Sequence, residues 1–429
     1  YLNGNDIIGQ IPSNFEKLVN LTSLNLSNLN LIGVLPAKML CFCKNLEKLE
    51  LQNNNLSGEI PKEISNLKKI VHLDLSHNLL EGSIPESISE LKNLVYLNIE
   101  CNFLSGVLPT GLFALTNLEL IDMSNNSIGG CIPREIENLK KLTFLDFWCN
   151  QLSGSIPETI GKCLNLSHII LSGNQLSGNI PSELGNLTRL IHLFLNANLL
   201  SGNIPESFSN FNLMTDLNLC KNRLTGNIPE NLSFCSQLQF LDLSKNLLTG
   251  GVPETFGNLT NLKFFSVKKN LLSGTIPETL SSLSLIENLF FSSNNFTGIV
   301  PESFSFLENL KILDLSDNEF LSIPDVLSNI IKSTNNRLGK QDSVQFDIER
   351  KRMENIDVIQ STLERVNLMR SDTYKPGVLK KEVKVQTKNS IVKKERIDYL
   401  FNVLKREVFK NIAVPKLATF VRSLTNRVI

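Results

Sequence analysis

Hydrophobic and polar positions recur with a period close to 24 residues along the first three quarters of the chain. One unit, residues 71–94, reads VHLDLSHNLLEGSIPESISELKNL. It generalises to LxxLxLxxNxLxGxIPxxLxxL, where apolar residues alternate around LxL and take helical spacing after the proline. The pattern predicts a short strand, a turn and a helical segment in every unit. Because one unit cannot bury its leucines alone, the units are expected to stack as a solenoid.

Prolines and asparagines mark the register of this repeat. The prolines stand at 12, 36, 61, 85, 109, 133, 157, 181, 205, 229, 253, 277, 301 and 324. An asparagine precedes most of them by seven residues; Leu29 breaks this rule, and Asn318 stands six before Pro324. The asparagine is expected to hydrogen-bond backbone groups where the chain leaves the strand. Glycine permits the next bend, and proline ends the pairing.

This repeat resembles that of leucine-rich repeat proteins of the 24-residue, plant-type subclass, with the signature LxGxIP. The resemblance covers residues 1–326 in about 14 registers, the first of them truncated. It implies an α/β fold: a right-handed solenoid with a parallel sheet on its concave face and a second short sheet near LxGxIP. Members are mostly ectodomains of receptor-like kinases and receptor-like proteins, or secreted inhibitors of cell-wall polygalacturonases. The resemblance therefore implies non-catalytic recognition of a protein or peptide ligand, with a co-receptor as a further partner.

The chain departs from the family pattern at both ends of the repeat region. Tyr1 to Asn5 enter midway through a repeat without the cysteine-paired cap, and no cysteine follows Cys235. The sequence carries no kinase signature (HRD, DFG or a glycine-rich loop). Because the first residue is not Met, the numbering is expected to begin inside a longer protein.

The ligand-facing positions follow from the register: relative to the asparagine, residues at −6, −4, −2 and −1 face the concave side. Most of them repeat the letters of LDLS. The units of Asn150, Asn174 and Asn198 carry large apolar and aromatic residues instead, which predicts an exposed binding patch. The alternative is that these rings pack on one another along a column. The predicted contact residues, with those that extend the −6 column, are Tyr96, Phe144, Asp146, Trp148, His168, Ile170, His192, Phe194, Asp216 and Phe240.

A basic column lies beside this patch. Lys221, Lys245 and Lys269 share the −1 position of consecutive units. Like charges about 5 Å apart on neighbouring strands repel each other, so a carboxylate or sulfate of a ligand would stabilise them. The alternative is a solvated basic rim.

The sequence predicts no catalytic site, no metal site and no cofactor. His168, His192 and Asp216 share the −6 column, but His168 and Asp216 are separated by two strand spacings, about 10 Å. A pH-sensitive pair of His192 and Asp216 is favoured over a metal site.

Charge divides the chain in two. The formal net charge is zero, from 42 Lys+Arg and 42 Asp+Glu. Residues 1–330 hold 20 basic and 31 acidic residues, a net of −11, and residues 331–429 hold 22 and 11, a net of +11. We expect a linker at 327–340 and a basic, mostly helical tail at 341–429. The tail is expected to dock on the acidic repeats or to contact an anionic membrane; nucleic acid is a less favoured partner.

Cysteines and glycosylation motifs give opposite indications of the compartment. The eight cysteines form no convincing pair, which weakens an oxidising location, while Cys43, Cys163 and Cys235 share one register and are expected in the core. Sequons favour secretion. They begin at Asn20, Asn25, Asn55, Asn125, Asn165, Asn186, Asn231, Asn258 and Asn295.

Three functions follow from these observations. The first is receptor-like recognition, outside the cell or at its surface, in signalling or defence. The second is a cytoplasmic scaffold whose basic tail attaches to a membrane or nucleic acid. The third is a secreted inhibitor of cell-wall hydrolases.

Overall fold

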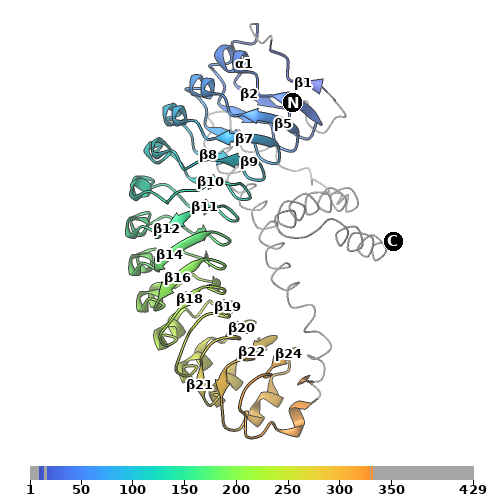
Figure 1. The fold of residues 1–429 in the computed structure, drawn as a ribbon, viewed down its shortest axis with the longest axis vertical. Coiled ribbons are helices and arrows are strands. Elements are labelled where there is room, and N and C mark those ends of the chain that lie inside the picture. Colours follow the sequence, from blue (N-terminus) through green and yellow to red (C-terminus); the bar gives the residue numbers. More distant parts are fainter. Residues whose placement is uncertain (1–8, 14–16, 329, 332–429) are drawn as a thin grey trace, which may run out of the picture. The chain divides into compact units, whose positions relative to one another are not determined.

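The computed structural model describes residues 9–13, 17–328 and 330–331. The chain divides into two units, Tyr1–Gln341 and Asp342–Ile429. The predicted tail at 341–429, and most of the predicted linker, lie outside the described residues. The repeats of the first unit form the predicted solenoid of parallel strands (Figure 1).

The main sheet of the solenoid takes one three-residue strand from each repeat. Every strand pairs in parallel with the next, one repeat further on, as Phe144 pairs with His168. The LxL motif forms these strands because its leucines turn to the core. The strands are β2 (Ser23–Asn25), β4 (Lys48–Glu50), β6 (His72–Asp74), β8 (Tyr96–Asn98), β10 (Leu120–Asp122), β11 (Phe144–Asp146), β13 (His168–Ile170), β15 (His192–Phe194), β17 (Asp216–Asn218), β19 (Phe240–Asp242), β20 (Phe264–Ser266), β22 (Asn288–Phe290) and β24 (Ile312–Asp314).

A second set of strands forms at LxGxIP, as the resemblance implied, in three sheets. The first joins β1 (Gly9–Gln10), β3 (Leu31–Val34), β5 (Asn55–Glu59), β7 (Leu79–Ser83) and β9 (Phe103–Ser105). The second joins β12 (Ser153–Gly154), β14 (Gln175–Asn179), β16 (Leu199–Gly202) and β18 (Arg223–Leu224), and the third joins β21 (Ser273–Gly274) and β23 (Asn295–Phe296). Backbone hydrogen bonds continue across the interruptions, for example from Ser153 N to Gly130 O at 2.7 Å.

The segments after the prolines are short helices. One is the α-helix α1 (Ala37–Phe42), and the others are 3₁₀-helices, a form that proteins use in short pieces. An acid often lies in the first turn, where it complements the N-terminal end of the helix, for example Glu86 and Glu158. The 3₁₀-helices are η1 (Lys62–Asn66), η2 (Glu86–Glu90), η3 (Thr110–Ala114), η4 (Arg134–Asn138), η5 (Glu158–Lys162), η6 (Ser182–Asn186), η7 (Glu206–Asn210), η8 (Glu230–Phe234), η9 (Glu254–Asn258), η10 (Glu278–Ser282), η11 (Glu302–Phe306) and η12 (Asp325–Leu327).

A continuous hydrophobic core runs between the strands and the helices from Ile11 to Leu327. Cys43, Cys163 and Cys235 are fully buried in it, which confirms their predicted role. Burial raises the pKa of Cys163 to about 11 and that of Cys235 to about 12, so both are neutral thiols at physiological pH. None of the eight cysteines, all of which lie in the described residues, forms a disulfide.

The repeated asparagines form a ladder of buried hydrogen bonds, as the sequence predicted. Asn198 is typical: its Oδ1 accepts a hydrogen bond from Leu176 N at 3.0 Å, and its Nδ2 donates to Leu171 O and Leu195 O, both at 3.0 Å. Each such amide therefore joins its own turn to the repeat before it. Buried backbone groups must be paired, so the ladder explains why one residue type recurs at this position.

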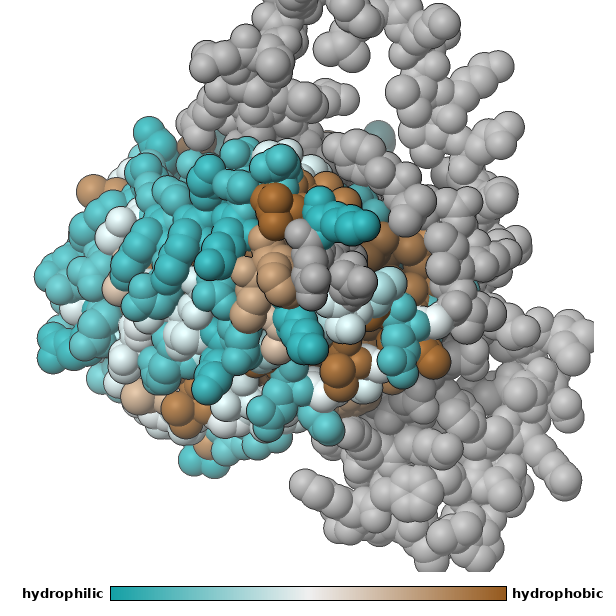
Figure 2. Space-filling model, turned by 90° about the horizontal axis from the view of Figure 1, so that it is seen from above, coloured by the Kyte–Doolittle hydropathy of each residue, from teal (hydrophilic) through white to brown (hydrophobic). Residues whose placement is uncertain are grey.

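The outer surface is mostly hydrophilic when seen from the N-terminal end, with hydrophobic side chains in small groups (Figure 2). Leu18, Val19, Ile32 and Val34, from the first repeats, are exposed. Within the described residues, every helix is too short or too polar to cross a bilayer.

Candidate functional site

Ring contacts run along the −6 column of the main sheet. Parallel pairing places each −6 side chain beside its counterpart in the next repeat, and the predicted column of packed rings is present. Asp216 divides the contacts at His192 from those at Phe240. The centroid distances are 4.0 Å for His72–Tyr96, 5.5 Å for Phe144–His168, 4.6 Å for His168–His192, 4.5 Å for Phe240–Phe264, and 5.8 Å for His192–Phe194, where a −4 residue joins the column.

The expected open exposure of the apolar patch is wrong for most of its members. In the structure of the whole chain, Phe144 is only 1% exposed and Phe194 only 7%. Stacking along the column contributes to this burial, because strands about 4.8 Å apart bring large side chains into contact. Trp148, His168 and His192 are half-buried and remain accessible. The other predicted contact residues that are buried are Tyr96, Asp146, Ile170 and Phe240.

The predicted pair of His192 and Asp216 is present. His192 Nε2 lies 3.1 Å from Asp216 Oδ2, and the two residues are paired in register between β15 and β17. A second histidine–carboxylate contact lies nearer the N-terminal end of the column. His72 Nε2 lies 3.8 Å from Glu50 Oε1, but burial and the nearby Lys48 charge lower the pKa of His72 to about 3. His72 is therefore neutral, and this contact is not an ion pair at neutral pH.

Buried aspartates line the −4 column. Burial raises the pKa of Asp74 to about 6, although hydrogen bonds from Ser76 oppose the shift. In Asp122 burial, together with the charges of Asp146 and Glu100, raises the carboxyl pKa well above its ordinary value. Burial likewise raises the pKa of Asp242, so these three carboxyl groups retain protons more readily than exposed ones.

The −1 column adopts a left-handed backbone conformation, which sequence reasoning missed. Its φ values range from +52° at His77 and Asp317 to +68° at Gly173. This region is uncommon for residues other than glycine and is best tolerated by asparagine. The asparagines at 28, 53 and 125 and the single glycine at this position were the signal that could have revealed it. Lys221, Lys245 and Lys269 share this conformation, with φ between +54° and +56°.

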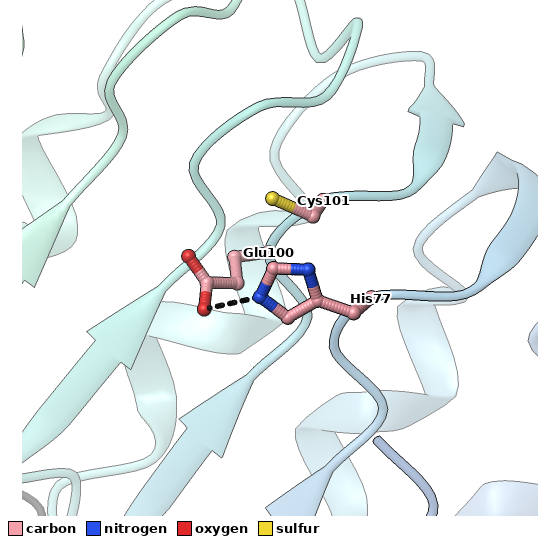
Figure 3. Close-up of side chains that lie close together, drawn as sticks. All are labelled: His77, Glu100 and Cys101. Carbon is pink, nitrogen blue, oxygen red and sulfur yellow. Dashed lines mark ion pairs between the residues drawn. The ribbon is translucent and has the colours of Figure 1, made fainter. Parts of the chain in front are cut away.

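A cluster of His77, Glu100 and Cys101 lies just after the ends of strands β6 and β8 (Figure 3). The three residues share no common column, so the sequence did not predict the cluster. His77 Nε2 lies 3.3 Å from Glu100 Oε1, and the ligand atoms of all three residues lie within 4.8 Å of one another. Although burial opposes the charged imidazolium, the interactions with Cys101 and Glu100 raise the pKa of His77 well above its ordinary value. His77 comes from one repeat and the other two from the next.

The predicted sequons fall into two groups. Exposed asparagines begin those at 20, 55, 186, 258 and 295. The side-chain amides of the other four donate hydrogen bonds within the protein: Asn25 to Glu50 Oε2, Asn125 to Cys101 Sγ, Asn165 to Lys140 O, and Asn231 to Glu206 Oε2.

Comparison with known protein families found leucine-rich repeats throughout the described solenoid. A model of multiple leucine-rich repeats matches residues 19–80, 44–104, 92–152 and 260–320, and a single-repeat model matches 165–187, 189–211, 214–235 and 237–259. A search of the curated proteins found no match.

Solved structures resemble the chain over about three quarters of its length. A plant peptide hormone receptor, RGFR1 in complex with RGF2, is 34% identical with a TM-score of 0.71, covering 76% of this chain and 56% of the receptor chain. The Arabidopsis receptor kinase HAESA, in complex with the peptide hormone IDA and the co-receptor SERK1, is 33% identical with a TM-score of 0.69, covering 75% and 57%. The Leptospira interrogans leucine-rich repeat protein LIC12759 is 31% identical with a TM-score of 0.63, covering 77% and 80%. The chain thus spans little more than half of the two plant receptor chains.

Proposed function

Since this chain belongs to the leucine-rich repeat proteins, we propose that it recognises a peptide or protein ligand on its main sheet, as part of receptor-like signalling. The observation that carries the proposal is the run of large side chains in three adjacent repeats, where Trp148, His168 and His192 keep accessible surface. The proposed role is recognition without catalysis. The proposed location is extracellular or at the cell surface.

Two similar structures support a peptide as the ligand class. RGFR1 was solved with RGF2, and HAESA with a peptide hormone and a co-receptor. Parallel strands present a regular row of side chains, which suits an extended chain whose residues meet successive repeats. A co-receptor is the proposed second partner.

The side chains of the site define the chemistry of the ligand. Trp148 offers a large ring with partial exposure, which is typical of residues that dominate binding energy. Lys221 and Lys269 are exposed, and Lys245 lies half-buried between them. Their charges favour an acidic residue or a free carboxylate in the ligand. We therefore propose a ligand that combines an apolar anchor with a negative charge.

A random peptide library displayed on phage, selected against the full chain, tests this proposal. The selected peptides are expected to be enriched in acidic and large apolar residues. Labelled peptide should then bind Trp148→Ala at least about tenfold more weakly than the unaltered protein, because an anchor ring is worth about 2 kcal/mol or more. Fluorescence anisotropy measures the affinity.

Phe306→Ala is the matched control. Phe306 is an exposed aromatic residue in η11, away from the main sheet, and its loss should leave affinity unchanged. Thermal unfolding of both variants verifies that they fold. Equal affinity of Trp148→Ala and the unaltered protein, or a failure to select any binding peptide, would refute the proposal.

A further inference from the structure

We propose that His77, Glu100 and Cys101 form a binding site for a zinc ion. Imidazole nitrogen, thiolate sulfur and carboxylate oxygen are the three kinds of ligand that zinc takes in proteins. In the described part of the chain, this is the one group of three or more such residues whose ligand atoms lie within reach of a common ion. Three protein ligands supply three of the four positions of a tetrahedral zinc.

Backbone geometry holds the three residues together. His77 and Cys101 occupy the −1 position of consecutive repeats and have nearly equal φ values, +52° and +53°. His77 N also donates a hydrogen bond to Glu100 O at 2.9 Å, which ties one turn to the next. Because both turns have the same conformation one strand spacing apart, their side chains leave the backbone in the same direction (Figure 3).

The distances suit a zinc ion after small side-chain movements. Bonds of 2.0 to 2.3 Å in a tetrahedral site place the ligand atoms about 3.3 to 3.8 Å apart. His77 Nε2 and Glu100 Oε1 already lie 3.3 Å apart, and the widest separation among the ligand atoms of the three residues is within 4.8 Å. Side-chain rotations of His77, whose side chain is 37% exposed, can close the remaining gap.

Hydrogen bonds from neighbouring residues orient two of the ligands, Glu100 and Cys101. Asn125 Nδ2 donates to Cys101 Sγ at 3.6 Å, and Ser124 Oγ donates to Glu100 Oε2 at 3.3 Å. The second bond leaves Oε1 directed at His77. Metal sites in proteins commonly carry such outer hydrogen bonds, which fix the direction of each ligand.

The −1 column itself supplies substitutions that preserve the fold. Asparagine occupies this position at 28, 53 and 125 with the same left-handed backbone, so Cys101→Asn and His77→Asn remove a ligand without a new backbone demand. Cys149→Asn is the matched control. It removes a cysteine of the same column, with φ of +55°, whose column neighbours are Asn125 and Gly173 rather than a histidine.

Zinc binding to the reduced full chain is measured by competition with a chromophoric chelator, and cobalt serves as a spectroscopic substitute. We expect one zinc per chain and a thiolate-to-cobalt charge-transfer band. Because residues 331–429 contain neither cysteine nor histidine, such a band reports on the repeats.

Cys101→Asn should abolish the band and weaken zinc binding at least about tenfold, and His77→Asn should weaken binding to a similar degree. Cys149→Asn should retain both the band and the affinity, and circular dichroism checks that all variants fold. If the unaltered chain binds no zinc, or if Cys101→Asn and His77→Asn bind it as tightly as the unaltered chain, the proposal is wrong.

Discussion

The carboxyl groups of Asp122 and Asp146 occupy directly paired positions of strands β10 and β11. Both residues are buried, at 1% and 0% exposure. Neighbouring strands lie about 4.8 Å apart, and two negative charges on paired buried residues repel each other strongly. Burial and the charge of Asp146 therefore together raise the pKa of Asp122. The central part of the main sheet therefore contains an acid that holds its proton to a higher pH than an ordinary aspartate.

Asp122→Asn is expected to stabilise the protein at neutral pH. An unfolded aspartate titrates near 3.9, and the folded carboxyl titrates at a higher pH. The folded state therefore binds more protons between the two values, and stability falls as pH rises through that window. The variant has no titrating group at this position. Its free energy of unfolding should therefore exceed that of the unaltered protein at pH 7, and the difference should vanish near pH 4. Urea unfolding followed by circular dichroism at both values measures it.

Asparagine fits the position of Asp122, and the chain also provides a comparison for its charge. Asn98 holds the same register in the preceding repeat, where its Oδ1 accepts a hydrogen bond from Glu100 N at 3.0 Å. Asp242 is a buried aspartate of the same column whose register neighbours are Asn218 and Ser266. Asp242→Asn should therefore give a smaller pH-dependent gain. Equal gains in the two variants would contradict a role for the Asp122–Asp146 pair.

Loss of one ladder asparagine should cost far more than loss of a surface one. Asn198→Ala leaves the buried Leu176 N–H without its side-chain acceptor. It also removes one of two amide donors from the Leu171 and Leu195 carbonyls, which keep the hydrogen bonds from Asn174 and Asn222. We expect a loss of about 1–3 kcal/mol, since one buried unpaired group costs about that much. Asn203→Ala, at an exposed position five residues further on, should change stability by less than about 0.5 kcal/mol.

Chemical denaturation of both variants, with hydrogen exchange of the amides around Leu176, tests the ladder. Amide exchange should quicken in the repeat of Asn198 and in the repeat before it, because its amide joins these two. Similar stabilities of the two asparagine variants would show that water replaces the lost bonds at little cost.

Most of the fold could be predicted from the repeat register, because the signals that determine it act over short stretches of the chain. Leucine spacing, the asparagine amide and the proline each act within one unit or between adjacent units, so their positions predict strand, turn and helix boundaries. Whether each short helical segment is an α-helix or a 3₁₀-helix could not be predicted from the repeat. Segments of three to five residues have the short lengths at which proteins use 3₁₀-helices.

The candidate site was predicted less completely than the fold. Comparing residues within one column correctly paired His192 with Asp216, because parallel register preserves the column. The same procedure overlooked His77, Glu100 and Cys101, since Glu100 belongs to the −2 column and the others to −1. It also overestimated the exposure of Phe144, because burial depends on the volume of side chains on adjacent strands rather than on the direction of one.

Glycan occupancy should follow the side-chain contacts of the sequons. If the protein passes through a secretory pathway, Asn186 and Asn258 are expected to carry glycans, since both are exposed at the ends of 3₁₀-helices. Asn25 should stay unmodified because it lies in the main sheet, with its Nδ2 2.7 Å from Glu50 Oε2. Peptide mapping by mass spectrometry after expression in plant secretory cells measures occupancy. Glycans on Asn25, or none on either exposed site, would contradict this expectation.

The left-handed −1 column has a consequence for how this protein changes over time. Histidine, cysteine, lysine, alanine, serine and aspartate all occupy it with φ between +52° and +56°. The hydrogen bonds of the following asparagine hold the turn, so the side chain before it can vary without altering the path of the chain. Each repeat thus offers one position where a substitution changes the side chain while the backbone conformation stays the same. For protein engineering, this row offers positions about one strand spacing apart at which neighbouring side chains can be combined into a new binding site.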